Sequence, residues 1–158
     1  MALTLNNNQI DDISVLSKLY NLTELCINHN QIYDVSALSN LTNLIVLNME
    51  NNQISDVSVL RNLSNLKSLH VSTNKISNIG GLSRLTNIEE LWLDHNEISD
   101  ISVLSGFTNL IHLRLNNNQI SDISALNNLT NLRILYLYNN PIKNYSSIEN
   151  LNIENLQK

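Results

Sequence analysis

Few side chains of this chain could take part in catalysis or metal binding. Cys26 is the only cysteine, and a nucleophilic cysteine needs a histidine within hydrogen-bond reach. His29 falls in the turn after Cys26, and His70 lies two repeats further along, about 10 Å away at the usual strand spacing. His70 and His112 are separated in the same way, which is too far for them to share a metal ion. There is also no glycine-rich phosphate loop and no His-Glu-x-x-His motif, so the sequence predicts no enzyme, no metal site and no cofactor.

Recognition of a partner is the chemistry that the sequence does favour. Trp92, Arg114 and Tyr136 follow His70 one after another at a constant interval. Trp, Arg and Tyr are the residue types most enriched where protein interfaces gain their binding energy. Aromatic residues make up only 4% of the chain, so a regular series of them needs a reason. The constant interval requires an element that returns the chain to the same position each time.

A 22-residue repeat supplies that element and spans nearly the whole chain. Its unit is LxxLxLxxNxIxDIxxLxxLxN, which explains why 30 asparagines and 29 leucines dominate the 158 residues. One asparagine recurs in every unit without insertion or deletion: Asn8, Asn30, Asn52, Asn74, Asn96, Asn118 and Asn140. Isoleucine follows each of these asparagines after two positions, and an apolar-x-apolar pair precedes each of them.

Each column of the repeat predicts a local structure. The apolar-x-apolar pair has the period of a short β-strand, and one strand in each repeat gives a seven-strand parallel sheet. The asparagine amide both donates and accepts hydrogen bonds, so the seven asparagines should form a ladder that satisfies the buried turns. Aspartates such as Asp12 and Asp34 would cap short turns, and a 22-residue unit leaves room only for 3₁₀ turns opposite the sheet. We expect one array of seven coils over residues 1–151, the first coil being partial, and a C-terminal cap over residues 152–158.

The unit resembles the 22-residue class of leucine-rich repeat, found in bacterial internalins and in the regulatory subunits of protein phosphatase-1. Residues 118–126, Asn-Gln-Ile-Ser-Asp-Ile-Ser-Ala-Leu, are closest to internalin repeats. The resemblance covers Leu3 to Leu151 and implies an α/β repeat solenoid. This would be a right-handed leucine-rich-repeat horseshoe, with the sheet on its concave side and 3₁₀ turns on its convex side. It implies a non-catalytic module that binds a protein partner, with an intracellular scaffold like the phosphatase-1 regulators as the alternative.

Side chains that the repeat does not dictate point out of the sheet on the concave face, where we expect the binding site. The first three repeats present mainly small or amide side chains there. The later repeats carry the candidate partner-binding residues His70, Glu90, Trp92, Asp94, His112, Arg114, Tyr136 and Tyr138. Four acidic residues against Arg114 give the face a net charge of −3, which favours a protein partner with a basic or mixed patch. Two alternatives stay open: a solvated face on which Arg114 only stacks on Trp92, and carbohydrate binding along the aromatic row.

Charge and hydropathy argue against other classes of partner. The net charge of −5 and the pI near 5.2 lack the basic footprint of a nucleic-acid-binding protein. No run of about 18 apolar residues occurs, so we expect no membrane insertion. The first coil begins directly on a strand, which favours an array cut from a longer chain or, second, a homodimer through this uncapped coil. An excised internalin-like domain would be secreted or attached to the cell surface, and the protein would otherwise be cytoplasmic.

Overall fold

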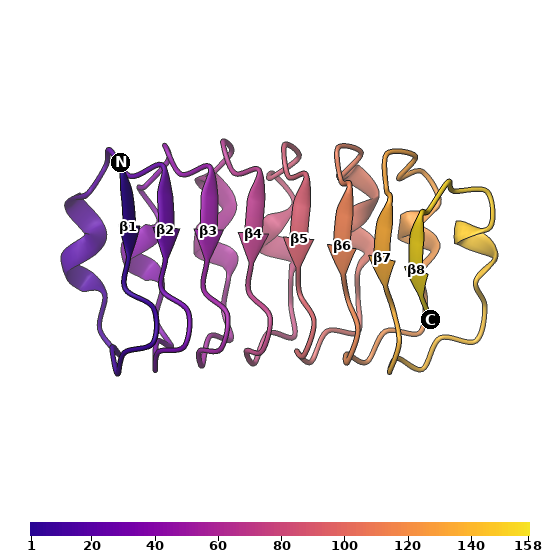
Figure 1. The fold of residues 1–158 in the computed structure, drawn as a ribbon, viewed down its shortest axis with the longest axis horizontal. Coiled ribbons are helices and arrows are strands. Elements are labelled where there is room, and N and C mark those ends of the chain that lie inside the picture. The colour runs from indigo at the N-terminus through magenta and orange to yellow at the C-terminus, as the bar shows by residue number, and fades with distance from the viewer.

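Eight short β-strands form one parallel sheet in a computed structural model that describes residues 1–158. They lie in chain order: β1 (Ala2–Thr4), β2 (Glu24–Cys26), β3 (Val46–Asn48), β4 (Ser68–His70), β5 (Glu90–Trp92), β6 (His112–Arg114), β7 (Ile134–Tyr136) and β8 (Asn155–Gln157). Figure 1 shows the strands side by side along the long axis of the molecule, with the helical return segments on the other side of the coils. The predicted parallel sheet, with one strand in each coil, is confirmed.

The strand count differs from the prediction at the C-terminal end. The sheet has eight strands and not seven, because residues 152–158, which we expected to form a cap, contribute β8. Strands β1 to β7 pair at the constant offset of the repeat, whereas Leu135 of β7 pairs with Leu156, one position short of that offset. One residue of the template is missing between Leu151 and Ile153, and this shift hides the last strand from a search at constant spacing. The segment therefore extends the sheet and covers the edge of β7.

Seven short 3₁₀ helices return the chain on the convex side: η1 (Ser14–Lys18), η2 (Ser36–Leu38), η3 (Ser58–Asn62), η4 (Gly80–Leu82), η5 (Ser102–Gly106), η6 (Ser124–Leu126) and η7 (Ser146–Ile148). Before each helix, a side-chain oxygen accepts a hydrogen bond from the backbone N–H two residues later. The bond from the N–H of Ser14 to Oδ1 of Asp12 measures 2.8 Å. Such bonds hold the pKa of four of these carboxyl groups, including that of Asp12, below the ordinary value. The predicted 3₁₀ turns and the role of the aspartate column are confirmed.

The core is one continuous stack of aliphatic side chains between the sheet and the 3₁₀ helices. Leucine, isoleucine and valine of the template columns are buried from Leu22 to Leu137, whereas Ile142 and Leu151 of the last coil are only partly buried. Phe107 is the only fully buried aromatic ring. In the first coil Leu3, Leu5 and Ile10 are only partly buried. Each coil thus gains most of its burial from its neighbours, as expected of a repeat protein. None of the helical turns has the length or the apolar character that a membrane-crossing helix requires.

The recurring asparagines bind the coils together where the strands turn. Nδ2 of Asn74 donates to the carbonyl oxygens of Val71, Ser72 and Met49, the last of which belongs to the preceding coil, at 3.1–3.2 Å. Oδ1 of Asn74 accepts the N–H of Ile54, also in the preceding coil, at 2.9 Å. The same four bonds recur at Asn30, Asn52, Asn96, Asn118 and Asn140. Asn8 makes only the two bonds within its own coil.

The residue before each of these asparagines has a left-handed backbone. The positive φ values lie between 52° and 59°, and four of the seven positions carry Asn, which tolerates this conformation well. His29 and His95 occupy two of the others, and the β-branched Thr73 occupies the last with φ of 54°. Thr73 is therefore the most strained residue of this column.

Gly80 and Gly81 replace larger template residues in η4. A Cβ at position 81 would lie 2.5 Å from Cα of Ser58 in the preceding coil, so only glycine fits this approach. Asp56 and Asn78 form an isolated parallel bridge between the same two coils. The glycine pair therefore marks a close contact between η3 and η4 rather than a loose turn.

Candidate functional site

Trp92, at the end of β5, lies between two other side chains of the predicted site. On one side the ring of His70 stacks on it, with centroids 3.8 Å apart and planes at 4°. On the other side Cζ of Arg114 lies 3.6 Å from the centroid of the Trp92 ring. The cause is the register, since these three residues end neighbouring strands and pair directly across the sheet. Both faces of the indole are therefore covered by the protein itself.

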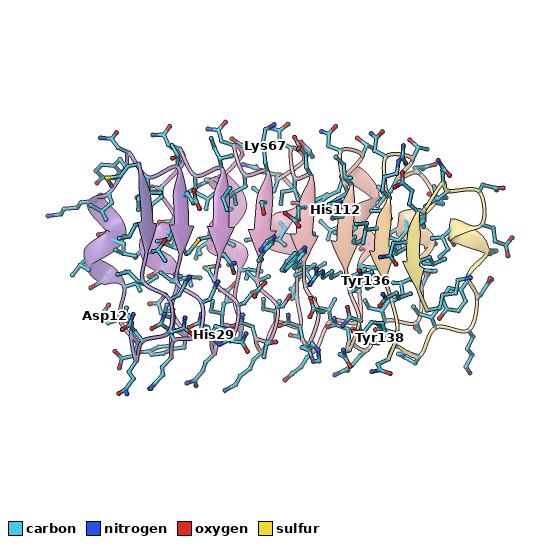
Figure 2. All side chains as sticks on the ribbon, viewed as in Figure 1. Asp12, His29, Lys67, His112, Tyr136 and Tyr138 are labelled. Atoms are coloured by element: carbon cyan, nitrogen blue, oxygen red, sulfur yellow. The ribbon has the colours of Figure 1, made fainter.

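Tyr136 of β7 completes a stacked row, a name we use for His70, Trp92, Arg114 and Tyr136. Cζ of Arg114 lies 5.4 Å from the centroid of the Tyr136 ring, within the range of a cation–π contact. The hydroxyl oxygen of Tyr136 accepts a hydrogen bond from Nδ2 of Asn155 in β8 at 3.2 Å. Figure 2 shows Tyr136 over the second half of the sheet and Tyr138 nearer the turn below it. The ring of Tyr138 takes no part in the row.

Acidic and imidazole groups alternate beside the stacked row. Glu90 lies between two histidines, with Oε2 3.3 Å from Nε2 of His70 and Oε1 3.6 Å from Nδ1 of His112. His70 also faces Glu50, in the turn after β3, whose Oε1 lies 3.8 Å from Nδ1. Ser68 adds a hydroxyl contact of 3.1 Å to Nε2 of His70. The arrangement is a chain of four titratable groups, Glu50–His70–Glu90–His112, across three strand intervals.

The pKa values of His70, Glu50 and Glu90 follow from burial and neighbouring charge. Burial lowers the pKa of His70 below its ordinary value, and Arg114 acts in the same direction, although Glu90 and Asp94 oppose it. Burial raises the pKa of Glu50, with a further contribution from Asp94. Burial alone would raise the pKa of Glu90, but His70 and His112 beside it hold that pKa below its ordinary value. The centre of the face therefore favours a neutral His70 between partly screened carboxylates.

Two buried polar atoms without hydrogen-bond partners lie in or beside this series of titratable groups. Oε1 of Glu50 and Oδ1 of Asn116 are buried and accept no hydrogen bond, and Asn116 is only 2% exposed. Between them in the same column, the hydroxyl of Ser72 donates to Oδ1 of Asp94 at 2.5 Å. This column is thus rich in acceptors, in contrast to the cationic Arg114 beside it.

The side chains considered for catalysis do not form a reactive cluster. Sγ of Cys26 lies 4.0 Å from Oε1 of Glu24, and burial together with this carboxylate raises the pKa of the thiol. A thiol with a raised pKa is a poor nucleophile at neutral pH. No group of three His, Cys, Asp or Glu side chains has the arrangement of a metal site.

The sequence analysis missed several residues of the site, among them Glu50, Ser68 and Asn155. Glu50 belongs to an outward-facing column but was not selected, because its contact with His70 depends on a diagonal approach between neighbouring coils. Asn155 was assigned to the cap, since the missing residue in the last repeat concealed β8. Searching the last repeat at a spacing one position shorter would have placed Asn155 beside Ile134 and found it.

Comparison with known proteins places this geometry in a family. The family described as leucine-rich repeats (2 copies) matches residues 20–62, 64–106 and 108–157. Among solved structures, the chain is similar to the internalin inlF of Listeria monocytogenes, with a TM-score of 0.96 and 40% identity over 98% of this chain and 46% of the other. The internalin C2 of the same species gives a TM-score of 0.94 and 36% identity over 99% of this chain and 70% of the other.

A more distant structure extends the likeness beyond internalins. A leucine-rich-repeat protein of Leptospira interrogans gives a TM-score of 0.89 and 28% identity over 96% of this chain and 41% of the other. No curated protein sequence matches the chain. The chain spans less than half of inlF, so the activities of whole internalins do not transfer to it directly. The repeat, the parallel sheet and these matches together show that the chain belongs to the leucine-rich-repeat family and carries repeats of the internalin type.

Proposed function

We propose that the chain is a non-catalytic recognition module that binds a protein partner on its concave face, with the stacked row at the centre of the contact. The leucine-rich-repeat family and the internalin neighbours support protein–protein interaction as the general function. Trp92, Arg114 and Tyr136 would be the anchors. Orientation and charge would be fixed by the other side chains of the site: Glu50, His70, Glu90, Asp94, His112 and Tyr138.

The observation that supports this proposal best is the order already present in the stacked row. His70, Trp92 and Arg114 are held against one another before any partner arrives. A surface that is already ordered loses little side-chain entropy on binding, so more of its contact energy appears as affinity. Random polar substitution of a solvated face would not be expected to place the only tryptophan between a histidine and the only arginine of these columns.

The same geometry counts against carbohydrate binding along the row. A sugar ring stacks on an open aromatic face, and both faces of Trp92 are covered by His70 and Arg114. The intracellular scaffold stays the second candidate, because the matched structures are internalins and not phosphatase-1 regulators. Dimerisation through the first coil stays a prediction, and measuring the oligomeric state of the purified chain would test it.

Affinity capture from the source organism or its host, followed by mass spectrometry, would test the proposed function. We expect Trp92→Ala and Tyr136→Ala each to weaken capture of the recovered partner by about 1–2 kcal/mol, because anchors at interface centres carry such energies. Folding should be intact in both variants, as circular dichroism would show.

Arg61→Ala is the matched control, because Arg61 lies in η3 on the convex side. Normal binding by both concave-face variants combined with weakened binding by Arg61→Ala would overturn the concave-face proposal.

A further inference from the structure

We propose that Arg114 is a preformed receptor for a carboxylate of the protein partner, so that the partner inserts an aspartate or glutamate side chain at the centre of the concave face. This inference rests on the proposed function and names the chemistry of the partner at one atom group. Its physical basis is the way in which the guanidinium is held, what it leaves unpaired, and the charges around it.

The guanidinium of Arg114 lies against the ring of Trp92, with the ring of Tyr136 farther away in the next strand. Its Cζ lies 3.6 Å from the centroid of the Trp92 ring and 5.4 Å from that of Tyr136. His70 supports Trp92 from behind at 3.8 Å, and Asn155 holds the Tyr136 hydroxyl at 3.2 Å. Stacking uses the faces of a guanidinium and leaves its N–H groups at the edge, in the fork that matches a carboxylate.

These N–H groups have no partner within the chain, although acidic side chains are close by. Glu90 is engaged by His70 and His112, and Asp94 accepts the hydroxyl of Ser72. None of the ion pairs of the structure includes Arg114. Its nitrogen atoms are not among the buried polar atoms without partners, so they reach solvent. A cation that is fixed in place, accessible and unpaired is a site prepared for an external anion.

The charges around Arg114 favour a carboxylate over a phosphate or sulfate. Glu90 lies in the neighbouring strand β5. Glu50 follows β3, three coils away, yet Arg114 is near enough to influence its pKa. A singly charged planar group meets less repulsion from these carboxylates than a doubly charged tetrahedral one. The same carboxylates would attract basic residues on either side of the inserted acid. The partner surface would then be mixed, with one acidic residue between basic ones.

Acetate is the probe for this site, because it is the carboxylate group without the rest of a partner. We would titrate the full chain with sodium acetate against sodium chloride at equal ionic strength, following the Nε–H signal of Arg114 and the indole N–H of Trp92 by NMR. One charge-assisted bidentate contact corresponds to a dissociation constant of roughly 6–80 mM. We therefore expect saturable shifts with acetate in this range and none with chloride.

Arg114→Lys is the decisive variant, since it keeps the charge and removes the planar fork. We expect acetate affinity, followed at the Trp92 indole, to fall by at least about 10-fold. Arg133→Lys is the matched control, because Arg133 is already near Glu154 at 3.6 Å and should not affect the titration. Equal affinity in Arg114→Lys, shifts that do not saturate, or tighter binding of inorganic phosphate than of acetate would each overturn the inference.

The recovered partner separates this inference from the proposed function. If the partner binds the concave face, Arg114→Lys should weaken it at least about 10-fold, and neutralising one acidic residue of the partner should make the variant and the parent equal. If no partner binds that face while acetate still saturates, the proposed function fails and the carboxylate site stands. If the partner binds the face with unchanged affinity in Arg114→Lys, the carboxylate site fails and the proposed function stands.

Discussion

The asparagine ladder and the stacked row are both columns with one side chain per coil, the ladder in seven coils and the row in four, yet they differ in almost every physical respect. The ladder carries the same residue in all seven coils, lies inside the turns and makes four hydrogen bonds at each complete rung. The row carries a different residue in each coil, faces outward and is held by stacking. One column satisfies the backbone, whereas the other leaves the N–H groups of Arg114 available to a partner.

The difference shows where to seek function in a repeat protein. A residue that recurs in every coil answers a demand that every coil shares, such as an unpaired carbonyl in a buried turn. A residue found in one coil only answers no such demand, so either chance or a partner accounts for it. We therefore expect changes in the ladder to alter stability and changes in the row to alter binding.

The largest effect on stability should come from breaking one rung. Asn74→Ala removes an amide that serves Met49, Val71, Ser72 and Ile54. The N–H of Ile54 then has no partner in a half-buried turn, and each of the three carbonyl oxygens loses one of its two hydrogen bonds. We expect the free energy of unfolding to fall by roughly 1–3 kcal/mol. Thermal or urea unfolding would measure it, and an unchanged melting temperature would refute the role of the ladder.

A second series of asparagines offers the control for that experiment. Asn87 is exposed and donates one hydrogen bond, from Nδ2 to the carbonyl oxygen of Ser64 at 2.9 Å. When the amide is removed, the carbonyl oxygen of Ser64 can accept a hydrogen bond from water instead. Asn87→Ala should therefore lower the free energy of unfolding less than Asn74→Ala. Equal losses would mean that the number of bonds and their burial do not set the value of an asparagine here.

The next effect should be a gain, at the residue that departs from the template beside the ladder. Thr73 has φ of 54°, a conformation that a β-branched residue adopts only at a cost, whereas Asn fills four of the seven equivalent positions. Thr73→Asn should raise the free energy of unfolding by about 1 kcal/mol, since the left-handed conformation costs roughly 1–2 kcal/mol. The reverse change, Asn51→Thr, should lower it by a similar amount in the same unfolding assay.

A gain from both substitutions, or from neither, would show that backbone strain does not distinguish this column. If Thr73→Asn lowers the free energy of unfolding and also weakens partner binding, then Thr73 contributes to binding and is not merely a strained structural residue.

Most of the fold could be predicted from the sequence, because the residues that determine it recur in every coil or nearly every coil. The strand and the 3₁₀ turn recur in all seven coils, and the aspartate before the turn recurs in five of them, so a departure in one coil does not hide the pattern. β8 escaped because a single missing residue shifts Leu156 out of the column that begins with Leu3. A search at fixed spacing detects substitution well and deletion poorly.

The candidate site followed only in outline. Register alone placed His70, Trp92 and Arg114 next to one another, but it could not show that the rings stack or that both faces of Trp92 are covered. Side-chain torsions decide those contacts, and they depend on neighbours such as Glu50 and Asn155 that lie outside the column. Outward-facing positions that the repeat does not dictate therefore indicate which residues form a site, but not how their side chains are arranged.

The smallest effect concerns pH and separates the two columns by their chemistry. Burial lowers the pKa of His70 below 6.5, so the unfolded chain binds a proton more readily than the folded chain. Stability should consequently fall as the pH drops below about 6.5, and the loss should end below the folded-state pKa of His70. The raised pKa of Glu50 has the opposite effect on stability, but at a pH nearer to its ordinary value of 4.5. Between pH 7 and pH 6, the expected change in stability therefore comes from the imidazole of His70.

His70→Gln isolates this contribution, because glutamine does not titrate and the other histidines are retained. Unfolding free energies of the parent and of His70→Gln, measured from pH 7.5 to 5.5, should converge as the pH falls, and the fluorescence of Trp92 should report the same transition in the parent, since His70 stacks on that ring. The amide of Asn74 has no proton to gain in this range, so the loss in Asn74→Ala should be the same at pH 7 and at pH 6. If the curves of parent and His70→Gln run parallel while the loss in Asn74→Ala varies with pH, then the ladder and not the row senses protons, and the division between a structural and a responsive column is wrong.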